Sequence, residues 1–206
     1  MFKAKYFLPL FFVLFFLCSC GHKAAMVSSW VDSSGPDYHA CDVLVIGVSK
    51  SEVVAKLWEA IFVEQFSAAG VQASANSVVI GHVPEPDRRS VEAAIQKAGA
   101  ATVLITHVID SSAETSTRPG FIRYEPGGFS HSLYGYYGRT YRAVYTPPLD
   151  VTRTTIRLET NLYDVAAARL IWSAQTEVRN PKLLRTDFGR VVGLLMTDMN
   201  KQGLLP

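Results

Sequence analysis

The sequence has few cysteines and none of the common catalytic motifs. Only three cysteines occur among 206 residues, and the five histidines are scattered along the chain. No Gly-x-Ser-x-Gly, His-Glu-x-x-His, Walker or Cys-x-x-Cys pattern is present. These absences argue against the hydrolases, zinc sites and nucleotide-binding enzymes that such motifs identify. We therefore predict a protein that is not an enzyme and has no metal or cofactor.

Charge is also scarce, and the small basic excess is local. Charged residues make up 18% of the chain, with 20 basic and 18 acidic side chains. Lys3 and Lys5 account for the difference, so the remainder of the chain is nearly neutral. It carries no basic run and no stripe of alternating aromatic and basic residues, so we expect no nucleic-acid partner.

The N-terminus has the layout of a secretory signal peptide. Lys3 and Lys5 precede the uncharged apolar run from Tyr6 to Leu17. A helix needs about 20 apolar residues to span a membrane, and this run is shorter. A short transmembrane anchor is the alternative interpretation.

The residues that close this run, Leu17-Cys18-Ser19-Cys20, resemble the bacterial lipobox. The resemblance implies that residues 1–19 are removed and that Cys20 is the lipidated residue, anchored to a membrane by its acyl chains. By analogy with Gram-negative lipoproteins, Gly21 in the next position implies sorting to the periplasmic face of the outer membrane and not retention at the inner membrane. The Ser-rich stretch to residue 40 then predicts a lipidated tether over residues 20–40. Cys41 is the remaining thiol, and we expect it to be buried and inert.

Hydrophobic patterns in the first half predict alternating strands and helices. Apolar runs at 41–48, 72–80 and 101–109 are typical of buried strands. Between them, Ser51 is a candidate N-cap for a helix that ends at Gly70, and Asp87 is one for a helix that ends at Gly99. The pattern predicts a βαβαβ unit in an α/β domain of two or three layers.

The second half predicts an antiparallel hairpin and a final helix. Apolar and polar residues alternate over 156–162 and 170–177, with a turn at 164–168. Thr186 or Asp187 is expected to cap the last helix. We find no internal repeat, so a single domain is expected over residues 41–206.

The hairpin carries a second resemblance. Its sequence, Leu162-Tyr163-Asp164 followed by Leu170-Ile171-Trp172-Ser173-Ala174, resembles a hairpin that recurs in small bacterial periplasmic lipoproteins of unknown function. The layout is also similar to the periplasmic domain of the curli secretion lipoprotein and to the lipoprotein that activates a penicillin-binding protein. These relatives bind other envelope proteins and are not enzymes. A core Trp172 and a turn-forming Asp164 are a sufficient structural explanation of the hairpin, without any ligand role.

A long insertion over residues 110–148 separates the two halves. Tyrosine, glycine and arginine are interleaved in it, a composition typical of adaptable binding surfaces. The alternative is an insertion of little order whose tyrosines pack on its own domain. The candidate partner-binding residues are Tyr124, Tyr134, Tyr136, Tyr137, Arg139 and Tyr141.

Two functions of different class remain open. The first is a membrane-anchored periplasmic lipoprotein that acts as a non-enzymatic binding or assembly module. Its partner would be an envelope protein, peptidoglycan or another copy of itself. The alternative is an envelope hydrolase or metal-binding protein built from the region between His107 and His131, with Asp110 nearby.

Overall fold

A computed structural model describes residues 24–33, 38–126 and 141–206 as a mixed α/β fold. Six strands form one sheet in the order β1-β8-β7-β4-β2-β3, and β5 and β6 pair separately. The predicted fold class is confirmed. The strands are β1 (Ala24–Val31), β2 (Val43–Gly47), β3 (Ala73–Ala75), β4 (Thr102–Arg118), β5 (Phe121–Pro126), β6 (Tyr141–Thr146), β7 (Leu149–Asp164) and β8 (Arg169–Arg179). The helices are α2 (Glu52–Ala68), α3 (Asn76–Val79), α4 (Arg88–Ala98) and α6 (Arg185–Lys201).

The predicted caps place the first two long helices correctly. The Ser51 hydroxyl accepts a hydrogen bond from the Val54 amide at the start of α2. Asp87 forms a reciprocal capping box with Ser90 at the start of α4. Gly99 ends α4 with a φ of 63°, a left-handed conformation that glycine adopts without steric cost.

The cap predicted for the last helix is wrong. Helix α6 begins after Leu184, whose side chain makes no capping hydrogen bond. Asp187 is instead buried inside the first turn, where its carboxylate accepts a hydrogen bond from the Lys182 amide. The acidic residue therefore closes the loop before the helix and does not cap it.

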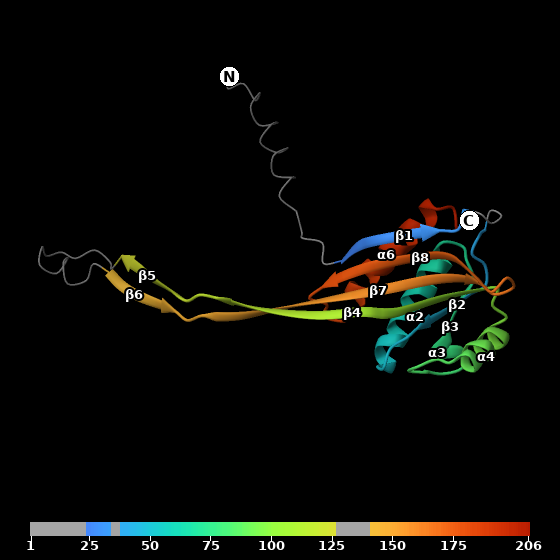
Figure 1. Ribbon diagram of the computed structural model, residues 1–206, viewed down its shortest axis with the longest axis horizontal. Coiled ribbons are helices and arrows are strands. Elements are labelled where there is room, and N and C mark those ends of the chain that lie inside the picture. The colour runs from blue at the N-terminus through green and yellow to red at the C-terminus, as the bar shows by residue number, and fades with distance from the viewer. Residues whose placement is uncertain (1–23, 34–37, 127–140) are drawn as a thin grey trace, which may run out of the picture.

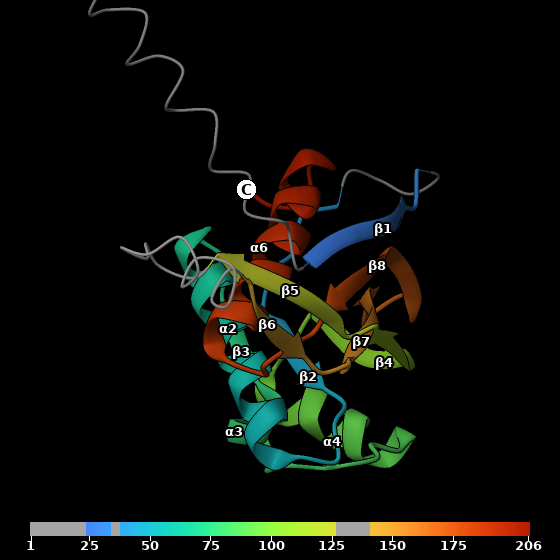
Figure 2. The same ribbon diagram turned by 90° about the vertical axis from the view of Figure 1, so that its left-hand side faces the viewer.

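Alternate residues of β2 belong to two different cores. Val43 and Val45 pack in the larger core, against α2 and α6, whereas Leu44 and Ile46 pack in the smaller one, against α4. Figure 2 shows α2 and α6 along one face of the sheet and α4 on the opposite side near β2. No described element covers that opposite side at β1, β8 and β7. The domain is therefore three-layered around β2 and two-layered around β8.

The predicted hairpin is confirmed as β7 and β8. Leu162 lies opposite Trp172 and Thr160 opposite Ala174, so that these four residues line the buried face. The Asp164 carboxylate accepts a hydrogen bond from the Ala166 amide, two residues further along the chain, and this local bond stabilises the turn.

The tether predicted over residues 20–40 differs from the structure. Residues Ala24–Val31 form the edge strand β1, which pairs antiparallel with β8. Its Ser29 hydroxyl also donates a hydrogen bond to Asp198 of α6. The strand predicted over 72–80 is likewise shorter than expected, because after Ala75 the chain turns into α3.

The expectation of a buried Cys41 is wrong. Strand β2 begins at Val43, so Cys41 precedes the buried run and its thiol is exposed. Among the described residues it is a free cysteine.

Tyr38, close to Cys41, gives a testable pH dependence. The pKa of the Tyr38 hydroxyl is raised from 10.0 to about 12. Burial is the largest cause, and the negative charge of Asp164 is the next. The folded state therefore holds this proton more tightly than the unfolded state does. The stability that it contributes is fully present below about pH 10 and is lost as the pH rises towards about 12.

The measurement is denaturant unfolding of the wild type and of Tyr38→Phe between pH 9 and pH 12. We expect the wild type to lose stability relative to the variant over the upper part of this range. Parallel pH profiles for the two proteins would contradict the assignment.

Strands β4 and β7 continue far beyond the sheet as a two-stranded ribbon. Strand β8 pairs with β7 only as far as Thr155, whereas β4 and β7 stay paired out to Arg118 and Leu149. The ribbon carries β5 and β6 at its outer end, and Figure 1 shows it as a long projection from the domain. We call residues 110–126 and 141–154 the arm. Most of the predicted insertion thus consists of paired strands.

A glycine permits the step from β4 to β5 within the arm. A Cβ atom at Gly120 would lie 2.6 Å from the Thr146 carbonyl oxygen and 2.9 Å from the Pro148 nitrogen. Any other residue at this position would force the two chains apart.

None of the described helices is both long and apolar enough to cross a membrane.

Candidate functional site

The arm exposes backbone edges along its length. From residue 110 outwards, among the described residues, β4 pairs only with β7, and β5 pairs only with β6. Nine residues of an extended strand, 110–118, cover roughly 30 Å at about 3.4 Å per residue. An isolated two-stranded ribbon of this kind is marginally stable in water, because each strand has only one neighbour.

The outer part of the arm is apolar and exposed. Phe121 and Ile122 on β5, Tyr145 on β6 and Leu149 on β7 each expose more than half of their surface. Nearer the domain the arm is polar, with hydroxyl contacts between Thr115 and Thr152 and between Thr117 and Asp150. An exposed apolar group at the end of a polar stem is typical of a contact surface for another protein.

Most of the predicted partner-binding residues lie outside the part of the chain that the structure describes. Tyr124 and Tyr141 belong to β5 and β6, where they lie opposite Ala143 and Pro126. The remaining four, Tyr134, Tyr136, Tyr137 and Arg139, and the predicted lipidation site Cys20 lie outside the described residues. Phe121, Ile122 and Leu149 are not among the predicted residues, because the prediction rests on the tyrosine, glycine and arginine composition of the segment.

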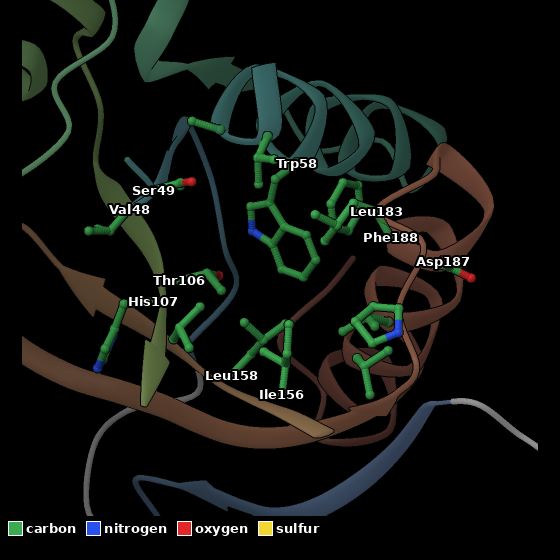
Figure 3. Close-up of a pocket in the computed structure, with 17 residues that line it drawn as sticks. Val48, Ser49, Trp58, Thr106, His107, Ile156, Leu158, Leu183, Asp187 and Phe188 are labelled. Carbon is green, nitrogen blue, oxygen red and sulfur yellow. The ribbon is translucent and has the colours of Figure 1, made fainter. Parts of the chain in front are cut away.

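A cavity of about 90 Å³ lies at the base of the arm. It sits where β2 ends and α2 begins, between the first turn of α2, strands β4 and β7, and the start of α6. Figure 3 shows its walls, with the Trp58 ring from α2 facing Ile156 and Leu158 from β7. The lining is predominantly aliphatic and aromatic, and Ser49, Thr106, His107 and Asp187 are its polar members.

The Trp58 indole has a polar group with no partner. Its side chain is 5% exposed, and no described residue accepts a hydrogen bond from Nε1. The ring is held by edge contacts with Phe62 and Phe188. A Cβ atom at Gly47 would lie 3.2 Å from Trp58 Cδ1, so the polar edge of the ring faces the end of β2. A buried N–H without an acceptor costs about 1–3 kcal/mol.

A buried carboxylate fixes the strand end beside this ring. Glu59 is 1% exposed, and its two oxygens accept hydrogen bonds from the Gly47 amide at 3.0 Å and the Ser77 amide at 2.9 Å. One helical side chain thus joins α2 to β2 and to α3. The wall that contains Gly47 is consequently rigid with respect to Trp58.

The rim of the cavity is strained and apolar. Leu183 has a φ of 56°, a left-handed conformation that residues with a side chain rarely adopt. Both Leu183 and Val108 line the cavity while exposing about half of their surface. Backbone strain that is retained at a cavity rim is a feature of binding sites.

The alternative metal or hydrolase site gains no support within the described part of the chain. His107 Nε2 lies 3.5 Å from the Glu159 carboxylate, and His131 lies outside the described residues. Across residues 24–33, 38–126 and 141–206, no group of three histidine, cysteine, aspartate or glutamate side chains could hold a metal ion.

The cavity has no signal in the sequence. Its walls come from four separated stretches of the chain, 47–58, 106–108, 156–158 and 178–191, and each contributes apolar residues of the kind found in an ordinary core. Trp58 lies on the buried face of α2, and a periodic pattern of apolar residues contains no information about an unpaired indole nitrogen.

Comparisons with known proteins give only distant likenesses. No protein-family model and no curated protein matches the chain. Among solved structures, the PelC dodecamer from Paraburkholderia phytofirmans matches with a TM-score of 0.43 and 15% identity, over 84% of this chain and 96% of that chain. Lipoprotein GNA1162 from Neisseria meningitidis matches with a TM-score of 0.39 and 16% identity, over 78% and 95% of the two chains. Neither reaches a TM-score of 0.5, and the family resemblance drawn from the hairpin stays a prediction.

Proposed function

We propose that this chain is a lipid-anchored periplasmic protein that acts as a non-enzymatic assembly module of the cell envelope. The arm is the binding element, and a second copy of the chain is the first partner that we expect. The single observation that carries the proposal is the projection of β4 and β7 beyond the sheet, with open edges and an apolar end.

As an isolated element, the arm leaves backbone groups unpaired along its edges and apolar side chains exposed at its end. Its backbone edges have donors and acceptors that another strand can pair, and strand addition supplies affinity through main-chain hydrogen bonds. Phe121, Ile122, Tyr145 and Leu149 would lose their exposure in such a contact, which adds a hydrophobic contribution. A second copy offers the same edges and the same apolar groups, so arm-to-arm pairing buries both.

The anchor belongs to the same proposal. Acyl chains on Cys20 would hold the domain at the periplasmic face of the outer membrane, and only a few residues separate Cys20 from β1. Copies confined to one membrane surface meet at a higher local concentration than free copies, which favours assembly through a weak contact.

The test is site-specific photo-crosslinking of the full lipoprotein in a bacterial envelope. A photoreactive phenylalanine analogue replaces Phe121 at the end of the arm, and in the matched control it replaces Val78 on α3, which is 85% exposed. We expect a ladder of self-linked species from position 121 and none from position 78. A single identified envelope protein in place of the ladder would keep the assembly role and correct the partner.

An arm-shortened chain provides the second half of the test. Ala113 and Thr154 are register partners, so residues 114–153 can be replaced by the two-residue turn Asn-Gly without disturbing the sheet. Self-association of this chain, measured by sedimentation, should be lost. Retention of the same assembly without the arm, or equal cross-linking from positions 121 and 78, would overturn the proposal.

A further inference from the structure

Strand β4 has an unpaired edge directly beside the cavity. Strand β2 pairs with β4 only as far as Gly47, which lies opposite Thr106. One more backbone hydrogen bond follows, from the Val48 amide to the Thr106 carbonyl. From residue 107 onwards, no described strand lies on this side of β4. A chain that continued the line of β2 would find free backbone groups there.

The size of the cavity limits what can fill it. About 90 Å³ is smaller than the roughly 150 Å³ of an apolar cavity that takes benzene. One branched aliphatic side chain fits such a space, whereas a benzene-sized ring needs more room. The strand residues of the lining are also aliphatic: Val108 belongs to β4 itself, and Ile156 and Leu158 belong to β7, which pairs with the other side of β4.

The unpaired indole nitrogen supplies the polar contact. Trp58 Nε1 can only donate a hydrogen bond, so the group that completes it must be an acceptor. Figure 3 places this nitrogen on the side of the ring towards Val48 and Thr106, away from Phe188. It therefore lies on the side of the cavity where β2 ends. A backbone carbonyl oxygen of an added strand is an uncharged acceptor that suits this apolar environment.

We propose that the cavity and the adjacent edge of β4 bind an extended peptide segment with one aliphatic residue. The segment continues the line of β2, its backbone pairs with β4, its aliphatic side chain enters the cavity, and one of its carbonyl oxygens accepts the Trp58 hydrogen bond. This site is separate from the apolar end of the arm. It therefore adds the chemistry of a partner segment to the proposed assembly role and does not require arm-to-arm contact.

The test is an NMR titration of a chain spanning residues 21–206, which contains every described element. The probe is the peptide acetyl-Lys-Thr-Leu-Thr-Lys-amide, and the matched control peptide has serine in place of leucine. We expect the leucine peptide to shift the Trp58 indole N–H resonance and the Val48 and Val108 amide resonances. The serine peptide should bind at least tenfold more weakly, because it cannot fill the cavity.

Two variants separate the hydrogen bond from the packing. Trp58→Phe keeps an aromatic ring and removes the donor, and it should weaken binding of the leucine peptide several-fold, as read from the Val48 and Val108 amides. Trp30→Phe is the matched control, because Trp30 lies on edge strand β1 and is not part of the cavity wall. Its binding should equal that of the wild type.

Three results would overturn the inference. They are equal binding of the two peptides, no effect of Trp58→Phe, and shifts of the same resonances by octanoate but not by the peptide, which would indicate a lipid ligand. The arm-shortened chain distinguishes this inference from the proposed function. It should still bind the leucine peptide after self-association is lost, because β4 residues up to Ala113 and the cavity remain.

Discussion

Replacement of Cys20 by alanine is expected to abolish attachment of lipid to this chain completely. The thiol is the only group at the proposed cleavage position that can form the thioether, so no partial activity remains after its removal. The predicted acyl chains would supply the membrane affinity, because at about 0.8 kcal/mol for each buried methylene two or three chains form a stable anchor. The measurement is incorporation of a labelled fatty acid in a bacterial host, followed by the mass of the mature chain.

Cys18→Ala is the matched control, because the two cysteines are separated only by Ser19. If Cys18 lies in the discarded peptide, this variant should be labelled like the wild type. Cys20→Ala should persist with its signal peptide uncleaved, since the lipidated cysteine is what the peptidase recognises. Equal labelling of the two variants, or loss of label in Cys18→Ala alone, would overturn the assignment of Cys20.

Trp172→Ala is expected to lower the free energy of unfolding by about 3–5 kcal/mol, a large share of the stability of a single domain. The Trp172 side chain is fully buried in the larger core, where β8 meets α6. Its Nε1 donates a hydrogen bond of 2.9 Å to the Asp198 carboxylate, which also accepts the Ser29 hydroxyl of β1. Truncation therefore leaves a cavity and removes one partner of a carboxylate that joins three elements.

The measurement is denaturant-induced unfolding of matched alanine variants. Trp30→Ala removes the same side chain from a position on β1 that is 50% exposed. This variant should lower the free energy of unfolding by less than about 1 kcal/mol. Trp172→Phe should fall between the two, because it fills part of the space and loses the hydrogen bond. Equal destabilisation by Trp172→Ala and Trp30→Ala would contradict the described packing.

Features whose cause is local in sequence were predictable. Ser51 and Asp87 cap helices because their side chains reach amides three residues ahead, and Gly99 ends α4 because it adopts a positive φ. The hairpin was predictable as well, because its alternation extends through both strands and its turn is stabilised by Asp164. Each of these signals lies within one segment of the chain.

Features that depend on distant residues were missed. Strand β1 has a polar, Ser-rich sequence typical of a tether, and only its pairing with β8 makes it a strand. The sequence of the arm indicates an insertion and not a pair of strands, because its inner part is rich in serine and threonine and has no buried face, so no apolar alternation marks it. The cavity requires Trp58, Ile156 and Leu183 to converge, and no pattern within a single segment reports that convergence.

The pairing of β1 with β8 also determines the order in which this domain can form. Strand β1 is synthesised first, yet its only neighbour among the described strands is the last one in the chain. Contacts between residues so far apart in sequence form slowly, because a long loop must close before they stabilise the fold. Because synthesis starts at the N-terminus, β1 has no described strand to pair with until β8 has been made. Strand β1 is therefore the last part of the described sheet to be secured, although it is the first to be made.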